Sequence, residues 1–123
     1  MSTIKPFRAV RPKAGAAGEI VSLPYDVMNS AEASGMAKGK PNSFLHVSRA
    51  EIDLPIGVDE HSQEVYDKAR ENFYNLIKSG ALVQDDKPYL YIYAQVMNGR
   101  KQVGLVASSS TEDYFNDVFE IYG

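Results

Sequence analysis

Tyr25 and Asp26 place a phenol and a carboxylate in the turn between an expected extended segment and an expected helix. The extended segment is the apolar stretch of residues 20–23, and Pro24 pushes the residue before it away from helical geometry. Proteins with α/β folds often place ligand groups at such a junction, beside the free N–H groups of a helix start. Tyr25 and Asp26 are therefore candidate ligand-binding side chains. The plainer interpretation is a turn with a buried tyrosine and a capping aspartate.

Basic side chains cluster shortly before this junction, at Arg8, Arg11 and Lys13. Three cations beside the small-residue loop of residues 14–18 could line an anion site. The loop lacks the Lys-Ser/Thr ending of a Walker A loop and the third glycine of a dinucleotide fingerprint, so it is a weak phosphate signal. The alternative is a solvated basic group next to a plain linker.

Residues 43–49 alternate in polarity and are predicted to form a strand. Leu45 and Val47 would then face the core, which leaves His46 at a rim, a groove or an interface. His46 and Arg49 are candidate ligand-binding residues, although a lone histidine on a strand is more often a hydrogen-bonded structural residue. The candidate polar constellation of the chain comprises residues at predicted strands or strand ends, namely Arg8, Arg11, Asp26, His46 and Arg49.

Two helices are expected around these residues. Asn29 and Glu32 have the spacing of a capping box for a helix over residues 30–38, which ends at Gly39. A longer helix is predicted over residues 59–79, because apolar side chains recur there at helical spacing and a glycine follows.

The strongest β signal lies in residues 89–107, where two apolar runs flank Asn98-Gly99. Both turn residues tolerate positive φ, so a two-residue hairpin turn is predicted. Apolar side chains on both sides of the hairpin indicate that both faces are at least partly covered, as in a central hairpin. The turn sets the cross-strand pairs, which are Ala94 with Val103 and Ile92 with Leu105.

Shorter elements complete the expected fold. Strands are predicted in residues 4–10, from residue 82 and in residues 118–122, and a short helix capped by Ser110 or Thr111 is predicted to run through Phe115. The fold class is therefore α+β. It is expected to be a single domain over residues 1–123, with a mixed sheet of about five strands around the central hairpin, packed by one long helix and one or two short ones.

Composition limits the possible functions. The 123 residues are 44% hydrophobic and 24% charged, which is typical of a soluble globular chain, and no apolar run approaches the length of a membrane span. The chain has no cysteine, which excludes disulfides, zinc thiolate sites and cysteine nucleophiles. The net charge of −3 makes a nucleic-acid partner unlikely. We expect a cytoplasmic protein with no membrane partner, and no metal site, because His61 and Glu64 are too few ligands.

An ordered series of motifs resembles a known family. The series includes Ile4-Lys-Pro-Phe-Arg, Pro24-Tyr-Asp-Val, Pro41-Asn-Ser-Phe-Leu-His-Val and Tyr89-Leu-Tyr-Ile-Tyr. It resembles the N-terminal part of the bacterial and archaeal domain-of-unknown-function family 1015 (DUF1015), over essentially the whole chain. Members of this family are usually several hundred residues long. They are remotely similar to the ParB and sulfiredoxin group, some of whose members bind nucleotides or phosphorylate free serine.

This resemblance implies roles for a few residues. Asp26 would match the acidic residue that such kinases use as a base, and Arg8 and Arg11 would face the phosphates of ATP or ADP. Typical relatives continue after an Asp-Tyr segment, here Asp113-Tyr114, into a basic-His-Glu-Thr motif, whereas this sequence continues with Val118-Phe-Glu-Ile-Tyr-Gly. The missing His-Glu element predicts a loss of catalysis, in a shortened relative or in a fragment of one.

Two functions follow as hypotheses. The first is a non-catalytic binding or self-association module, a homo-oligomer that covers surface left open by the shorter domain. The alternative is a nucleotide-binding or kinase-like enzyme that acts on a small molecule such as free serine, with a small-molecule or phosphate ligand near Tyr25, His46 and Arg49.

Overall fold

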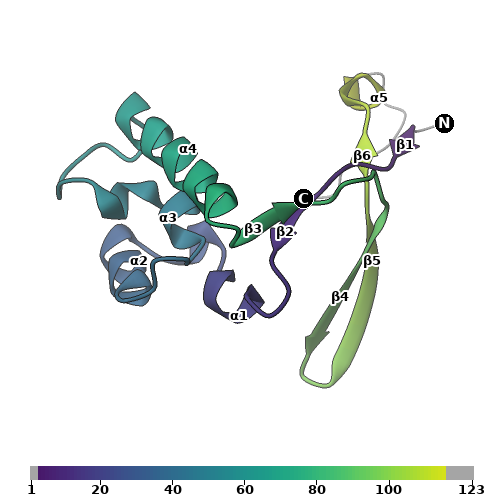
Figure 1. Cartoon of the computed structure of the whole chain (residues 1–123), viewed down its shortest axis with the longest axis horizontal. Helices are drawn as coiled ribbons and strands as arrows, with labels where there is room; N and C mark the ends of the chain where they lie inside the picture. The colour runs from purple at the N-terminus through teal and green to yellow at the C-terminus, as the bar shows by residue number, and fades with distance from the viewer. Residues whose placement is uncertain (1–2, 116–123) are drawn as a thin grey trace. The chain divides into compact units, whose positions relative to one another are not determined.

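The computed structural model describes residues 3–115, which fall into two compact units. One unit is the continuous segment Val10–Val83. The other combines Met1–Ala9 with Gln84–Gly123, so its described part joins the start of the chain to its last third. Figure 1 shows the elements of both units.

The unit Val10–Val83 is mainly helical. Its helices follow in the order α1 (Ala17–Ile20), η1 (Tyr25–Val27, a 3₁₀ turn), α2 (Ser30–Ala37), α3 (Leu45–Ser48), η2 (Ala50–Asp53, also 3₁₀) and α4 (Gln63–Lys78). A two-stranded sheet of β2 (Val10–Pro12) and β3 (Leu82–Gln84) brings the two ends of this unit together. The prediction of a short strand from Leu82 is confirmed.

The long helix predicted over residues 59–79 is confirmed as α4, which begins later, at Gln63. The backbone N–H of His61 donates to the side chain of Asp59 at 2.9 Å, and this local turn delays the helix start. Val65 and Leu76 are the buried residues of α4. Gly80, with φ of 83°, follows the helix end as expected.

The second predicted helix is confirmed as α2. The side-chain oxygen of Asn29 accepts from the backbone N–H of Glu32 at 2.8 Å, and the Asn29 amide donates to the Glu32 carboxylate at 3.1 Å. Gly39 has the positive φ expected after the helix end. Ala33 and Ala37 form the buried side of this helix.

The predicted strand over residues 43–49 is wrong, because this segment contains the short helix α3. Phe44 and Val47 are three residues apart and pack together against the core cluster that contains Ile20 and Leu76. Leu45 joins the other cluster, with Met28, Ala33 and Ala37. One helical turn lets neighbouring apolar residues reach two clusters, and the alternation in sequence hid this arrangement.

The expected extended segment at residues 20–23 is only partly present. Ile20 is the buried last residue of α1. Val21 follows in extended geometry, but the described strands include no pairing for this segment. The turn that carries Tyr25 and Asp26 is therefore not preceded by a strand.

The other unit contains a long hairpin and short elements. β4 (Tyr91–Met97) pairs antiparallel with β5 (Arg100–Val106), β1 (Ile4–Lys5) pairs with β6 (Ser108–Ser109), and the short helix α5 spans Thr111–Phe115. The Ser110 hydroxyl accepts from the backbone N–H of Glu112 at 3.2 Å, which confirms the predicted cap. The predicted strand at residues 118–122 lies outside the described residues.

The fold is α+β as expected, but the single mixed sheet of about five strands is wrong. The six described strands form three separate two-stranded sheets. The segment 4–10 contributes β1 to one sheet and the first residue of β2 to another, because the chain is irregular between them around Pro6. Short helices also outnumber the one or two predicted. None of the described helices has the length and hydrophobicity needed to cross a membrane.

The hairpin has the predicted turn and register. Ala94 faces Val103 and Ile92 faces Leu105, and Asn98 and Gly99 both have positive φ. The expected cover on both faces is wrong, because every residue of β5 and every residue of β4 except Tyr91 is exposed.

Candidate functional site

Tyr25 and Asp26 lie in η1 and point to solvent. Tyr25 is 62% exposed, and the Asp26 carboxylate makes no hydrogen bond or ion pair with the described residues. The plainer interpretation, a buried tyrosine with a capping aspartate, is therefore wrong. The cap of the following helix is Asn29.

The two candidate arginines of the N-terminal segment belong to different units. Arg8 lies with the hairpin unit, where its Nε donates to the backbone oxygen of Asp85 at 2.8 Å. Arg11 lies on β2 in the helical unit, which also contains Asp26. Within the helical unit, no hydrogen bond or ion pair connects Asp26 with His46 or Arg49.

His46 is held by oxygen acceptors at both ring nitrogens. Its Nδ1 lies 2.8 Å from Oδ2 of Asp53 in η2, and its Nε2 lies 3.0 Å from the backbone oxygen of Lys40. Asn72 of α4 completes this cluster, because its amide donates to the backbone oxygen of His46 at 2.7 Å and to Asp53 at 2.9 Å. Both ring nitrogens thus have partners within the protein, and the cluster fastens α3, η2 and α4 together.

Arg49 forms a second polar cluster at the end of α3. Its Nε lies 3.1 Å from the carboxylate of Glu51, which makes an ion pair but not an aligned hydrogen bond. One Nη atom donates to the carboxylate of Glu60 at 3.3 Å, and the other donates to the hydroxyl of Ser30 at 3.3 Å. Ser30 in turn donates to Glu51 at 2.9 Å. The side chains of Arg49 and Glu51 are only 13% and 7% exposed. This pair is therefore a nearly buried joint between α2, α3 and η2.

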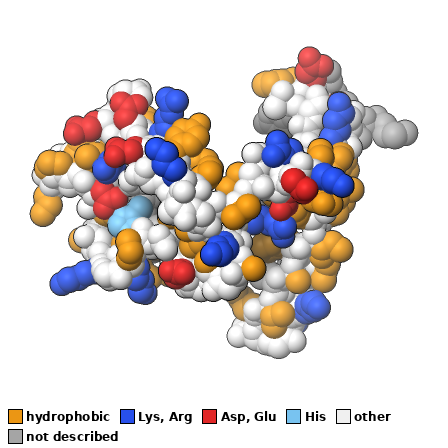
Figure 2. Space-filling model, viewed as in Figure 1, with side chains coloured by type: hydrophobic (Ala, Val, Ile, Leu, Met, Phe, Trp, Pro, Cys, Tyr) orange, Lys and Arg blue, Asp and Glu red, His pale blue; other side chains and the backbone are white. Residues whose placement is uncertain are grey.

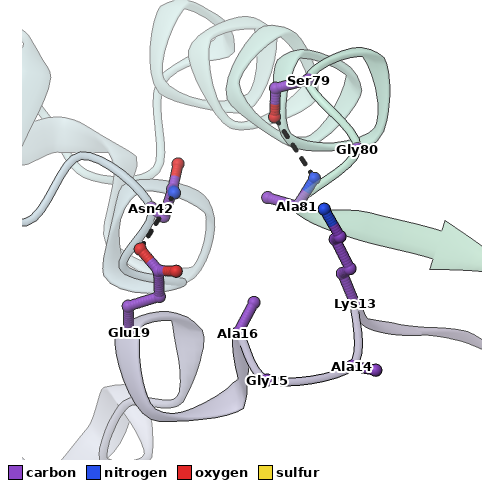
Figure 3. A pocket seen from close by; sticks show the side chains of 9 residues that line it. All are labelled: Lys13, Ala14, Gly15, Ala16, Glu19, Asn42, Ser79, Gly80 and Ala81. Carbon is purple, nitrogen blue, oxygen red and sulfur yellow. Dashed lines mark hydrogen bonds between the residues drawn. The ribbon is translucent and has the colours of Figure 1, made fainter.

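Two open hollows flank Asn42 and Ser79 in the helical unit. The larger, of about 390 Å³, is lined by the loop of residues 13–16 and by Glu19 on one side and by the end of α4 on the other. Figure 3 shows Lys13 and Glu19 on separate parts of its wall, with Glu19 accepting from the Asn42 amide at 3.2 Å. The neighbouring hollow, of about 370 Å³, is lined by the His46 cluster.

These hollows offer polar groups but no matched nucleophile and base among the described residues that line them. The hydroxyl of Ser79 donates to the backbone oxygen of Leu76 at 3.0 Å and accepts from the N–H of Ala81 at 3.4 Å, so the helix end satisfies it. Within residues 3–115, no three side chains of the types that bind metals gather around one point. These hollows have the volume and the polar lining that suit a small polar molecule.

The most unusual surface lies on the β4–β5 hairpin. One face of this sheet, which we call the hairpin face, carries Ile92, Ala94, Val96, Val103 and Leu105, with Lys101 opposite Val96 at the turn end. Its four large side chains are between 60% and 77% exposed. Figure 2 shows hydrophobic side chains lying open along this hairpin. Soluble monomers rarely expose a contiguous apolar patch of this kind, which makes the hairpin face a candidate interaction surface.

Sequence reasoning identified His46 and Arg49 but missed their partners. Asn72 carried a usable signal, because it lies between Ala69 and Leu76 on the apolar stripe of a strongly amphipathic helix, where a polar residue needs a partner. Asp53, Glu51 and Ser30 carried none, since they lie in loops or at helix ends where polar residues are ordinary.

Comparisons with known proteins give one match. A family model described as a protein of unknown function (DUF1015) matches residues 4–122. No curated protein and no solved structure matches the sequence. The match extends over the residues of both units.

Proposed function

This chain belongs to the DUF1015 family, and we propose that it is a non-catalytic binding module that associates with copies of itself through the hairpin face. The observation that carries the proposal is the exposure of Ile92, Val96, Val103 and Leu105 on one side of a two-stranded sheet. An isolated hairpin is only marginally stable in water, and a second apolar layer stabilises it.

The free energy that burial of this face can supply is comparable with the cost of association. Fully burying a valine, leucine or isoleucine side chain stabilises by roughly 1.5–3 kcal/mol, so the four large side chains on each of two copies offer at most roughly 12–24 kcal/mol. Association costs about 4–15 kcal/mol in lost freedom of motion. The two ranges overlap, so burial of this face supplies free energy of the same order as the cost of association.

The polar residues support a non-catalytic role. Both ring nitrogens of His46 are occupied by Asp53 and Lys40, and Arg49 is held by Glu51 and Ser30. These side chains stabilise the helical unit and leave no free base or free guanidinium for a substrate.

The alternative function, a nucleotide-binding or kinase-like enzyme, has one observation in its favour. The carboxylate of Asp26 is exposed and has no partner among the described residues, as a base awaiting a substrate would be. Remote similarity to the ParB and sulfiredoxin group, on which this alternative depends, stays a hypothesis. A cytoplasmic location likewise stays a prediction of the sequence.

Sedimentation analysis of matched variants tests the proposed function. The unaltered chain of 13.6 kDa is expected to sediment at twice its own mass or more. Val103→Lys places a charge on the hairpin face and should lower the mass. Gln102→Lys adds the same charge to the opposite face of the same strand and should leave the mass unchanged. A monomer at all concentrations, or equal behaviour of both variants, would contradict self-association through this face.

A further inference from the structure

The outer edge of β4 is a second surface of the hairpin, distinct from the hairpin face. In the sheet that the structure describes, β4 pairs with β5 on one side and with no strand on the other. The isolated bridge between Phe7 and Tyr89 lies before the start of β4. An edge of this length presents a row of backbone N–H and C=O groups that can pair with another strand.

The hairpin register shows which backbone groups are available at this edge. Met97 and Arg100 flank the two-residue turn, and in such a turn the flanking pair exchanges backbone hydrogen bonds. Hydrogen-bonded and non-hydrogen-bonded pairs then alternate along the ladder. The N–H and C=O groups of Ile92, Ala94 and Val96 are therefore directed away from β5, toward the open edge.

The β4 edge lacks the features that protect edge strands. Between Tyr91 and Met97 it has no charged residue and no proline, and its register with β5 contains no bulge. The β5 edge differs, because Arg100 and Lys101 lie at its start. Charged residues are a common defence against edge-to-edge pairing. The two edges of the hairpin are therefore expected to differ in their tendency to pair with another strand, and β4 is the edge that lacks protection.

We propose that β4 pairs antiparallel with β4 of a second copy of this chain, centred on Ala94, to form a continuous four-stranded sheet. In this register Ala94 faces Ala94 of the second copy, and Ile92 faces Val96. Every outward-directed N–H and C=O of the three residues then finds a partner. No charge faces another charge across the new ladder, so a copy of this strand is a complementary partner for it.

Edge pairing goes beyond the face-to-face association proposed above, and it rests on a different observation. Pairing of β4 leaves the hairpin face uncovered and places two such faces side by side on one sheet. Two of these sheets can then pack through their apolar faces, as the layers of a β-sandwich do. The combination of the two interfaces gives a tetramer with two kinds of two-fold contact, a common symmetry among soluble oligomers.

Single cysteines provide the test, because the chain has none of its own. Gln95 of β4 and Gln102 of β5 face each other on the side opposite the hairpin face, so Gln95→Cys and Gln102→Cys are matched variants. With β4 edges paired about Ala94, the two copies of position 95 lie about 8 Å apart. The two copies of position 102 then lie about 16 Å apart, from the spacing of strands and of residues along them.

A bifunctional thiol reagent with a reach of about 8 Å should therefore join two chains of Gln95→Cys and leave Gln102→Cys unjoined. Cross-linking of Gln102→Cys alone would overturn the proposal in favour of β5 pairing. No cross-linking of either variant in a chain that still sediments as an oligomer would overturn edge pairing but leave the face-to-face association intact. A monomeric chain without cross-links would overturn both.

Discussion

Asn72 on α4 donates a 2.7 Å hydrogen bond to the backbone oxygen of His46 in α3. The same amide donates to the carboxylate of Asp53 at 2.9 Å, and Asp53 in turn lies 2.8 Å from the His46 ring. One side chain of the long helix thus binds both the backbone of the short helix and the Asp53 carboxylate that contacts the His46 ring. The side chain of His46 therefore lies in a hydrogen-bonded cluster that links α3, η2 and α4.

Replacing Asn72 by alanine should destabilise the protein by about 1–2 kcal/mol, because it leaves the half-buried oxygen of His46 without this donor. Urea unfolding followed by circular dichroism measures the change. Asn75→Ala is the matched control, since Asn75 lies one turn further along the same helix as an exposed residue and should change stability by less than about 0.5 kcal/mol. Equal effects of the two variants would show that Asn72 does not fasten the helices.

Removing Arg49 should cost about 3 kcal/mol, because Arg49→Met leaves the Glu51 carboxylate nearly buried without its cation. The double variant Arg49→Met, Glu51→Leu should be more stable than the single variant, since it removes the orphaned charge as well. Lys68→Ala is the control, because it removes the surface ion pair between Lys68 and Glu71. Such a pair contributes less than about 1 kcal/mol to the free energy of unfolding. A double variant less stable than Arg49→Met would contradict this account.

Proline substitutions distinguish pairing at the β4 edge from pairing at the β5 edge of the hairpin. Ala94→Pro removes an N–H directed to the open edge of β4, a position at which a strand tolerates proline. We expect this variant to lose edge pairing and to sediment as the smaller, face-to-face oligomer. Lys101→Pro removes the corresponding N–H on the β5 edge and should keep the mass of the unaltered chain. Loss of mass in the second variant alone would place the contact on β5.

Nucleotide binding is tested by thermal denaturation with ATP, ADP and free serine. A ligand at about 100 times its Kd stabilises a protein by about 2.7 kcal/mol, which is readily detected as a rise in Tm. From the proposed function we expect no rise, and no difference between the unaltered chain and Asp26→Asn. A rise that Asp26→Asn abolishes would instead support the kinase-like alternative.

The helices and turns that depend on interactions between residues close in the sequence were predictable. The hairpin register depends on two turn residues with positive φ, Asn98 and Gly99, and on the apolar pairs around them. The start of α2 depends on one side chain, Asn29, that satisfies a backbone N–H three residues later. Such interactions span a few residues and are the same in any fold.

Elements set by distant contacts were not predictable. Leu45 and Val47 alternate with His46 and Ser48 as the residues of a strand would, yet they lie in a helix whose apolar side chains join two separate core clusters. The contacts of His46 with Asp53 and Asn72 likewise depend on the packing of α3, η2 and α4, which are separated in the sequence. A short apolar run has no period long enough to distinguish these outcomes.

The sequence by itself determined the family, the α+β class, the long helix, the capped helix and the register of the hairpin. Only the tertiary structure decided that the strands pair two by two, that His46 and Arg49 are occupied by neighbours, and that the hairpin face is open. Which strands pair, and which segment packs on an apolar face, depends on contacts between residues far apart in the sequence. Several segments have similar local patterns and could serve equally well in either role. The apolar character of Ile92 and Leu105 predicts that they will be buried, but the sequence does not say what buries them.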